Sequence, residues 1–197
     1  MDMFSEALKY AAEKHRGMKR KSDPKPYLLH PLEAAVIAGT LTDDPEILSA
    51  ALLHDTVEDS GADLSELASL FSPRVADLVA SETEDKMRGM DPGETWQVRK
   101  EQSLDKLAGA SDPGVGILWL SDKLSNMRSF ARMYKAQGDA MWGRFNQKDP
   151  SKQEWYYRSV CGLLEGALGD TEAFAELKRL VGAVFGDEAH RPRRNKS

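Results

Sequence analysis

The sequence predicts an all-α, single-domain protein, a bundle of about nine or ten helices. Apolar residues recur at helical spacing through almost the whole chain, and no segment shows the alternation that is typical of a strand. Residues that commonly begin a helix, namely proline and the capping residues Ser and Asp, precede most of these segments. In addition, 197 residues are enough for one substantial core but too few for two ordinary domains.

The helices of the first half are marked by their apolar faces and their starts. The first helix has Phe4, Leu8 and Ala11 at helical spacing. Further helix starts are indicated, in chain order, by Pro31, Pro45, Asp63, and Ser72 with Pro73. The helix that begins at Pro45 is expected to continue without a break through the sequence EILSAALLHDTVED.

A loop separates the two halves of the chain. Residues 86–94, KMRGMDPGE, contain two glycines and a proline, which predict a loop of functional length or a mobile lid. A helix is expected over 95–110, followed by the most apolar helix, over 115–138, and by two more over 155–168 and 171–185.

Composition and charge exclude several classes of protein. Hydrophobic residues make up 41% and charged residues 30%, which excludes a disordered or fibrous chain. The net charge, 27 minus 32 or −5, argues against nucleic-acid binding. No apolar run approaches the roughly 18 residues that cross a bilayer, and the first residues do not form a secretory signal, so no membrane association and a cytoplasmic location are expected.

The positive charges are unevenly distributed. Residues 14–25, KHRGMKRKSDPK, hold six Lys or Arg and one Asp, so this segment carries +5 and the rest of the chain −10. Such a cluster is either a cradle for phosphate groups or an ordinary solvated surface. A second basic run, 190–196, follows the last apolar residues, and we expect residues 188–197 to be a disordered tail after a domain that spans 1–187.

Histidine and carboxylate side chains gather where the chain is otherwise apolar. His54 and Asp55 interrupt an apolar helix, and Glu58 and Asp59 follow each of them by four residues, so one helix face would hold an imidazole and three carboxylates. Like charges at that spacing destabilise a helix unless a cation lies among them. A divalent metal ion is therefore the simplest explanation.

Two further residues complete a set of metal ligands. Asp122 comes directly after the apolar run VGILWL, with Asn126 one turn later, and His30 lies at the start of another helix. Each alone is more often a satisfied core histidine or a capping acid. Together with His54 and Asp55 they form a set of two His and two Asp, which suits one first-row divalent ion such as Mn, Fe, Co or Zn.

Four motifs carry a resemblance to a known family. The sequences HRGMKRK, PYLLHP, AALLHDTVED and SDKLSNMR occur in order over residues 3–132. In this order and spacing they resemble the HD-domain hydrolases of the RelA/SpoT type, especially the stand-alone small alarmone hydrolases related to the metazoan SpoT homolog. The resemblance implies an HD-domain helical bundle.

The resemblance also implies roles for particular residues. One Mn²⁺ would be held by His30, His54, Asp55 and Asp122, and Glu58 and Asp59 would be the catalytic pair that orients or activates the attacking water. The residues expected to contact the nucleotide substrate are Arg20, Lys21, Lys86 and Asn126.

The chain departs from the family pattern at several positions. Where long RelA/SpoT proteins have Asp-Arg-Leu-His-Asn, this chain has Asp122, Lys123, Leu124, Ser125 and Asn126. The basic turn reads RKSDPKPY, and the acidic motif ends in Ser60 instead of Thr. All four implied metal ligands are present.

The function implied by the resemblance is hydrolysis of the 3′-pyrophosphate of the alarmone (p)ppGpp to GDP or GTP and pyrophosphate. Synthetase activity is not expected, because the last 60 or so residues are predicted to be packed helices. Two alternatives remain open at this point, an HD-domain phosphohydrolase of another phosphorylated nucleotide and a regulatory module that binds an alarmone without cleaving it. The residues do not determine the oligomeric state.

Overall fold

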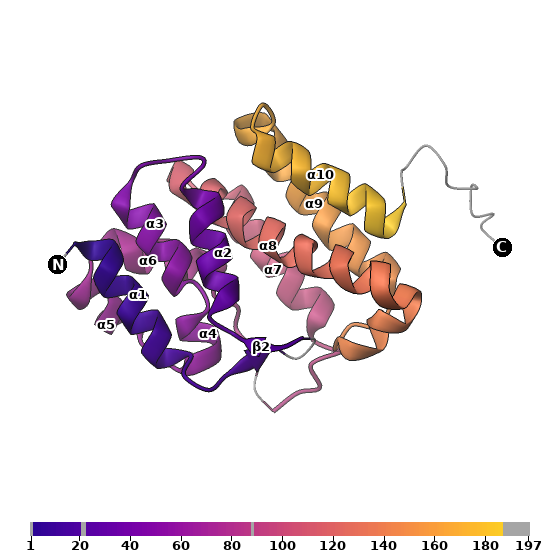
Figure 1. Cartoon of the computed structure of the whole chain (residues 1–197), viewed down its shortest axis with the longest axis horizontal. Helices are drawn as coiled ribbons and strands as arrows, with labels where there is room; N and C mark the ends of the chain where they lie inside the picture. The colour runs from indigo at the N-terminus through magenta and orange to yellow at the C-terminus, as the bar shows by residue number, and fades with distance from the viewer. Residues whose placement is uncertain (1, 21–22, 88, 187–197) are drawn as a thin grey trace.

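A computed structural model describes residues 2–20, 23–87 and 89–186. The first half of the described chain contains α1 (Met3–Lys14), β1 (Lys19–Arg20), β2 (Asp23–Pro26), α2 (Leu29–Ala38), α3 (Pro45–Leu53), α4 (Thr56–Ser60), α5 (Leu64–Leu70) and α6 (Pro73–Glu82). The second half contains α7 (Trp96–Ala108), α8 (Pro113–Gln137), the 3₁₀ helix η1 (Gly138–Arg144), α9 (Pro150–Leu168) and α10 (Glu172–Phe185). The predicted all-α bundle is confirmed (Figure 1).

Helix α8 is the centre of the bundle. It packs against α2, α3 and α6 on the amino-terminal side and against α9 and α10 on the other (Figure 1). Several of its side chains are fully buried, including Leu118, Trp119, Leu120, Leu124 and Met127. Because Asp122 lies within this apolar stretch, the packing of α8 carries a carboxylate into the middle of the protein.

Most helix starts follow the expected capping chemistry. Asp44 accepts a hydrogen bond from the backbone N–H of Glu46 and precedes Pro45, and Ser72 caps α6 in the same way through Val75. The prediction that α2 begins at Pro31 is wrong, since α2 begins at Leu29. The proline is tolerated in the third position because the first N–H groups of a helix have no partner within it.

The expected continuous helix from Pro45 through Asp59 is also wrong, because it breaks into α3 and α4 at His54 and Asp55. Side chains replace the missing backbone bonds there. Nδ1 of His54 lies 2.9 Å from the Ala51 carbonyl oxygen, and the Thr56 hydroxyl donates to the Leu53 carbonyl at 2.7 Å. As a result, His54 lies at the end of α3, and Glu58 and Asp59 lie on a different helix, α4.

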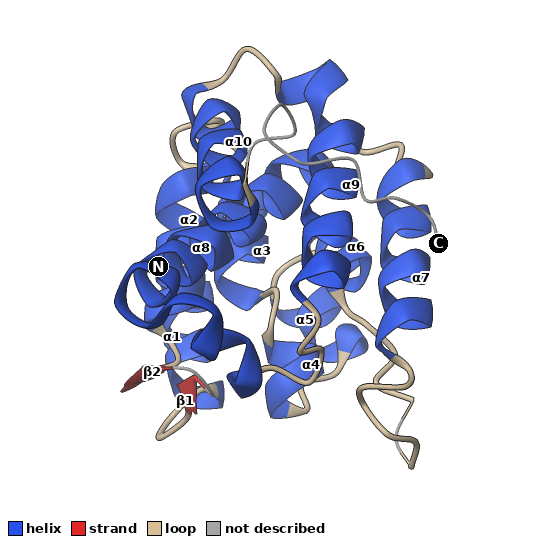
Figure 2. Ribbon diagram, turned by 90° about the vertical axis from the view of Figure 1, so that its right-hand side faces the viewer, coloured by secondary structure: helices blue, strands red, loops and turns tan. Residues whose placement is uncertain are grey.

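A small antiparallel hairpin, β1 paired with β2, was not predicted (Figure 2). Strands of two and four residues are too short to show a period-two pattern. Lys19 pairs with Pro26 and Arg20 with Asp23, so the hairpin belongs to the basic segment. It therefore gives part of that segment a defined backbone.

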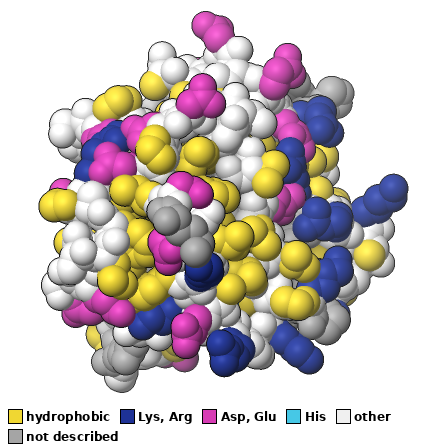
Figure 3. Space-filling view, turned by 60° about the vertical axis from the view of Figure 1, so that its left-hand side comes forward, with side chains coloured by type: hydrophobic (Ala, Val, Ile, Leu, Met, Phe, Trp, Pro, Cys, Tyr) yellow, Lys and Arg dark blue, Asp and Glu magenta, His cyan; other side chains and the backbone are white. Residues whose placement is uncertain are grey.

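The surface charge is uneven. On the face shown in Figure 3, hydrophobic side chains spread across the middle and Lys and Arg side chains gather toward the right-hand and lower edges. Within the residues described, no helix is both long and apolar enough to cross a membrane. The predicted tail, 188–197, and the boundary at 187 lie outside the described residues.

Candidate metal centre and active site

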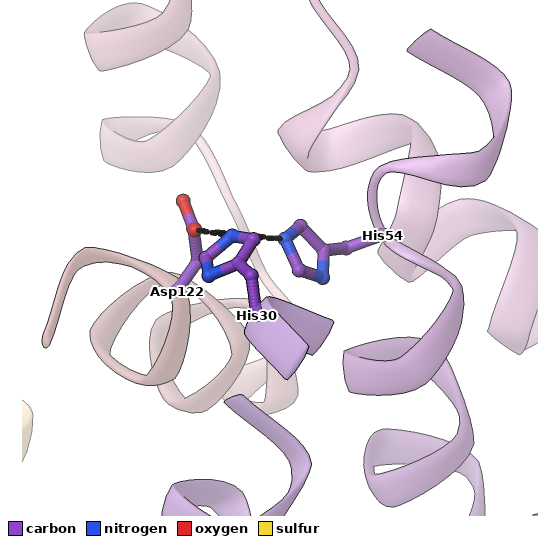
Figure 4. A group of neighbouring side chains, drawn as sticks. All are labelled: His30, His54 and Asp122. Atoms are coloured by element: carbon purple, nitrogen blue, oxygen red, sulfur yellow. Dashed lines mark hydrogen bonds and ion pairs between the residues drawn. The ribbon is translucent and has the colours of Figure 1, made fainter. Parts of the chain in front are cut away.

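Three of the predicted metal ligands meet in the interior of the bundle (Figure 4). His30 comes from the first turn of α2, His54 from the break after α3, and Asp122 from the middle of α8. Oδ1 of Asp122 lies 2.9 Å from Nε2 of His30 and 3.5 Å from Nε2 of His54, and the two Nε2 atoms are 3.2 Å apart. In the described part of the chain these three residues are the group whose ligand atoms all lie within 4.8 Å of one another. We call them the inner centre.

Each imidazole makes a hydrogen bond through Nδ1, on the side away from the inner centre. These bonds determine which ring nitrogen carries the proton and which one has a free lone pair. Nδ1 of His54 faces the Ala51 carbonyl oxygen, which only accepts, so this nitrogen carries the proton. Nδ1 of His30 lies 2.8 Å from the Ser125 hydroxyl, which gives its own proton to Glu33, so this nitrogen donates too. Both Nε2 atoms of the neutral rings therefore offer lone pairs.

Two nitrogen lone pairs and a carboxylate oxygen converge with no proton between them. Such an arrangement is repulsive unless a cation lies among the three atoms, and imidazole and carboxylate together suit a first-row divalent ion. Without that ion a proton is the substitute: burial alone would lower the pKa of His54, but the Asp55 and Asp122 carboxylates raise it well above its usual value. The residues present thus fit the implied metal ion.

The positive charge of a neighbouring lysine helps to keep the Asp122 carboxyl group ionised. Burial would raise its pKa, but the Lys123 ammonium and the two imidazoles hold it well below its usual range. Lys123 contacts the second oxygen of Asp122 and also Oε2 of Glu82, at 3.2 Å, and its ammonium lies 4.6 Å from the ring centre of Trp119. Lys123 and Glu82 were not predicted as parts of the site.

The fourth predicted ligand, Asp55, lies beside the inner centre. Its Oδ2 is 3.3 Å from Nε2 of His54 and 3.4 Å from Nε2 of His30, and its side chain is 18% exposed where those of the imidazoles are almost fully buried. The structure thus places Asp55 next to both imidazoles without including it in the group of three.

The predicted catalytic pair, Glu58 and Asp59, lies on α4 next to Asp55. Burial, followed by the charge of Asp55, raises the pKa of Glu58 to about 6. A carboxyl group with such a pKa can exchange a proton near neutral pH, as a general base requires. On the other side, Nζ of Lys86 lies 2.5 Å from Oδ1 of Asp59 and 3.6 Å from Oε1 of Glu58.

Sequence reasoning missed Tyr27, which joins the two groups of carboxylates. Its hydroxyl lies 2.7 Å from Oδ2 of Asp55 and 2.6 Å from Oδ2 of Asp59. The Tyr27 hydroxyl therefore contacts both Asp55, beside the inner centre, and Asp59, of the predicted catalytic pair. The available signal was its place in the motif PYLLHP, three residues before His30.

A cleft of about 460 Å³ opens beside these carboxylates. Met18, Lys19, Arg20 and Tyr27 line it from the hairpin side, and Glu58, Asp59 and Lys86 line it from α4 and the loop that follows α6. Pro92, Arg99, Phe145 and Asn146 complete its lining. The cleft places acidic groups and basic groups within reach of a single ligand.

Of the predicted substrate-binding residues, Arg20 and Asn126 are joined to the inner centre. Nη2 of Arg20 donates to Oδ1 of Asn126 at 2.6 Å, and Nδ2 of Asn126 donates to Oδ1 of Asp122 at 2.6 Å. Lys86 reaches the same cleft from the opposite side, where it pairs with Asp59. Lys21 lies outside the described residues.

Lys19 and Arg99 also line the cleft but were not among the predicted site residues. The Arg99 guanidinium is held by Glu84, with Nη1 to Oε2 at 2.7 Å. No motif marks Arg99, which lies in the first turn of α7 and reaches the cleft only through the packing of that helix.

Comparison with known proteins identifies relatives of this chain. The family model described as an HD domain matches residues 7–143. A GTP pyrophosphokinase of Myxococcus xanthus is 36% identical over 135 residues, and a guanosine-3′,5′-bis(diphosphate) 3′-pyrophosphohydrolase of Aquifex aeolicus is 40% identical over 123 residues. These matches cover 68% and 62% of this chain but only 18% and 17% of the relatives.

Two solved structures share the fold over most of the chain. One, described as a metazoan ortholog of SpoT that hydrolyses ppGpp, is 28% identical with a TM-score of 0.73, over 91% of this chain and 94% of its own. The other, from Listeria monocytogenes, is 29% identical with a TM-score of 0.69, and the match covers 80% of this chain and 99% of the Listeria chain. The resemblance seen in the motifs is confirmed: the chain belongs to the HD-domain family and is similar to a SpoT-type protein over most of its length.

Proposed function

We propose that the chain hydrolyses the 3′-pyrophosphate of (p)ppGpp to GDP or GTP and pyrophosphate, without synthetase activity. The observation that carries this proposal is the cleft, which is lined by a pair of acids and a basic hairpin and is joined to the neighbouring inner centre by the contact between Tyr27 and Asp55. The solved relative that hydrolyses ppGpp matches nearly its whole length to this chain, and it supports the same substrate.

We assign the inner centre and Asp55 to one divalent ion, for which Mn²⁺ is our first choice. When bound, such an ion polarises a phosphoryl oxygen and makes water more acidic. Nε2 of His30, Nε2 of His54 and Oδ1 of Asp122 would hold it, and Asp55 is near enough to both imidazoles to join them. Lys123 keeps Asp122 ionised and available as a ligand.

The acid pair handles the proton of the reaction. Water adds to the phosphorus attached to the ribose 3′-oxygen, the bond between that phosphorus and the 3′-oxygen breaks, and the 3′-oxygen takes up a proton. Glu58, with a pKa of about 6, accepts the proton of the attacking water. Asp59 is held by the Tyr27 hydroxyl, and it positions the water beside Glu58.

The basic residues of the cleft neutralise the substrate. A guanosine tetraphosphate carries four or more negative charges, which a chain of net charge −5 otherwise repels. Arg20 lies on the hairpin side and Lys86 on the opposite side, so the pyrophosphate can be held between two cations. Asn126 links Arg20 to Asp122 and so ties the position of the substrate to that of the inner centre.

The test is release of pyrophosphate from ppGpp by the purified protein, with Mn²⁺ and again with a chelator. We expect release that requires the metal, and metal analysis of the protein identifies the ion.

A parallel panel of nucleotides addresses the two alternatives. Comparable rates on deoxynucleotides would favour another phosphohydrolase, and tight ppGpp binding without turnover would favour a regulatory module. Transfer of pyrophosphate from ATP to GDP would contradict the absence of synthetase activity.

A further inference from the structure

A chain of polar contacts runs from the surface helix α10 to His30. Nε and Nη2 of Arg128 donate to the two carboxylate oxygens of Glu176, at 2.9 and 2.6 Å, and Nη1 of Arg128 lies 3.3 Å from Oε1 of Glu33. The Ser125 hydroxyl donates to Oε2 of Glu33 at 2.8 Å. The same hydroxyl lies 2.8 Å from Nδ1 of His30. Four side chains from the three helices α2, α8 and α10 thus connect to one nitrogen of His30.

The direction of each hydrogen bond follows from the number of protons available. A serine hydroxyl has one proton, and the Glu33 carboxylate next to Arg128 can only accept. Ser125 therefore donates to Glu33 and accepts from Nδ1 of His30. With its proton on Nδ1, neutral His30 presents a lone pair on Nε2, which is the atom that faces Asp122 and His54.

Without Ser125 the other tautomer of His30 would be favoured. Nδ1 would be buried without an acceptor, which is costly. The proton could instead lie on Nε2 and bond to Oδ1 of Asp122, only 2.9 Å away. Such a hydrogen bond would occupy two of the three atoms that a metal ion needs, so metal binding would have to break it.

We propose that Ser125 is a positioning residue, which relays the negative charge of Glu33 to His30 and keeps His30 in the tautomer that binds the metal ion. The inference rests on the metal centre of the proposed function but not on its substrate. Ser125 is one of the positions at which the chain departs from long members of the family. It is fully buried on α8, one turn from Ser121.

The test compares the Mn²⁺ dissociation constant of the wild-type chain with those of three single variants and one double variant, measured from the electron paramagnetic resonance signal of free Mn²⁺. Loss of a residue that orients a metal ligand typically weakens metal binding by about 10- to 100-fold, and we expect this for Ser125→Ala. Glu33→Gln, which keeps its shape and changes a partly exposed side chain, should weaken binding less.

Ser121→Ala is the matched control. Ser121 lies on the same helix, is equally buried, and donates its hydroxyl proton to the Ile117 carbonyl of its own helix instead of to the site. We expect its dissociation constant to equal that of the wild type. In the double variant, Glu33→Gln should add nothing to Ser125→Ala, because Glu33 acts on His30 only through the hydroxyl.

A second readout does not depend on metal. Nitrogen-15 shifts of the His30 ring in the metal-free protein should indicate a protonated Nδ1 in the wild type and in Ser121→Ala, and a protonated Nε2 in Ser125→Ala.

Equal metal affinity and equal ring shifts in wild type and Ser125→Ala would overturn the inference, as would additive effects of the Ser125→Ala and Glu33→Gln substitutions. If Ser125→Ala does not fold, an unchanged metal affinity of Glu33→Gln overturns it instead. A folded wild type that binds no metal would overturn the metal centre itself, which is a separate result.

Discussion

The inner centre and the rim of the cleft use the same kinds of charged and polar groups in opposite ways. At the inner centre the side chains of His30, His54 and Asp122 are 1 to 5% exposed, and each has a partner on a packed helix. At the rim, Glu58, Asp59 and Lys86 are 23 to 37% exposed and pair with one another. The inner groups are therefore arranged before any ligand arrives, whereas the rim groups must exchange partners when a substrate binds.

The energetic consequences differ accordingly. Removing one partner from a buried charged group leaves the other uncompensated, which costs far more than losing an exposed ion pair. Substitutions at the inner centre should therefore abolish metal binding and turnover together. At the rim, some substitutions should lower turnover, and others should weaken substrate binding.

The largest effect is expected from Asp122→Asn, which removes the charge of a ligand but keeps its shape. Metal-ion catalysis contributes several kcal/mol, so turnover should fall by about 1,000-fold or more. Metal content and pyrophosphate release measure the two consequences. Asp77→Asn, an exposed acid on α6, is the control. Normal turnover by Asp122→Asn would show that the inner centre takes no part in the reaction.

The next effect is expected from Glu58→Gln, which removes the proposed general base. Loss of a general base typically lowers turnover by about 100-fold or more. The Michaelis constant and the metal affinity should be nearly unchanged, since Glu58 lies outside the inner centre. Steady-state kinetics together with a metal titration separate these outcomes, and metal loss in this variant would make Glu58 a ligand instead.

The dependence of turnover on pH follows from the same residue. Glu58 accepts a proton only when it is ionised, so wild-type activity should rise with pH through about 6 and then level off. A cation beside Asp55 offsets part of the charge that raises this pKa, so the midpoint with Mn²⁺ should lie at or below 6. In Glu58→Gln this limb of the profile should disappear.

Arg20→Ala should act on substrate affinity. Hydrogen bonds to charged groups contribute about 1.5–3 kcal/mol, so the Michaelis constant for ppGpp should rise by about 10- to 100-fold while turnover changes little. Arg16→Ala, an exposed arginine of the same basic segment, is the matched control. An equal effect of both substitutions would mean that the segment attracts substrate by its overall charge alone.

Tyr27→Phe should have a smaller effect because the ring stays in place. Its hydroxyl joins Asp55 to Asp59, and both carboxylates can find water as a substitute partner at the edge of the cleft. We expect turnover to fall by about tenfold, as for one hydrogen bond to a charged group. A larger loss accompanied by loss of metal would place Tyr27 among the groups that support the inner centre.

The smallest effect is expected from Lys86→Met. Lys86 is 37% exposed and must leave Asp59 before it can meet a phosphate, so its net contribution is that of a surface ion pair. The Michaelis constant should rise about fivefold or less, and its dependence on salt should weaken. A rise as large as that for Arg20→Ala would mean that Lys86 is a principal phosphate contact.

The sequence by itself determined the helical class, most helix starts and the types of residue at the site. These features are local: a capping residue acts within one turn, and the motifs around His30, His54 and Asp122 can be identified without knowing their neighbours. The resemblance to the HD-domain family rested on those same short segments.

Only the tertiary structure decided how these residues meet. The break at His54 and Asp55 replaces the expected continuous helix because side chains take over the backbone bonds there. The bond between His30 and Ser125 joins residues 95 positions apart, and that between Arg20 and Asn126 joins residues 106 apart. Such contacts depend on how α2, the hairpin and α8 pack against one another, and helix propensity and spacing carry no information about that packing.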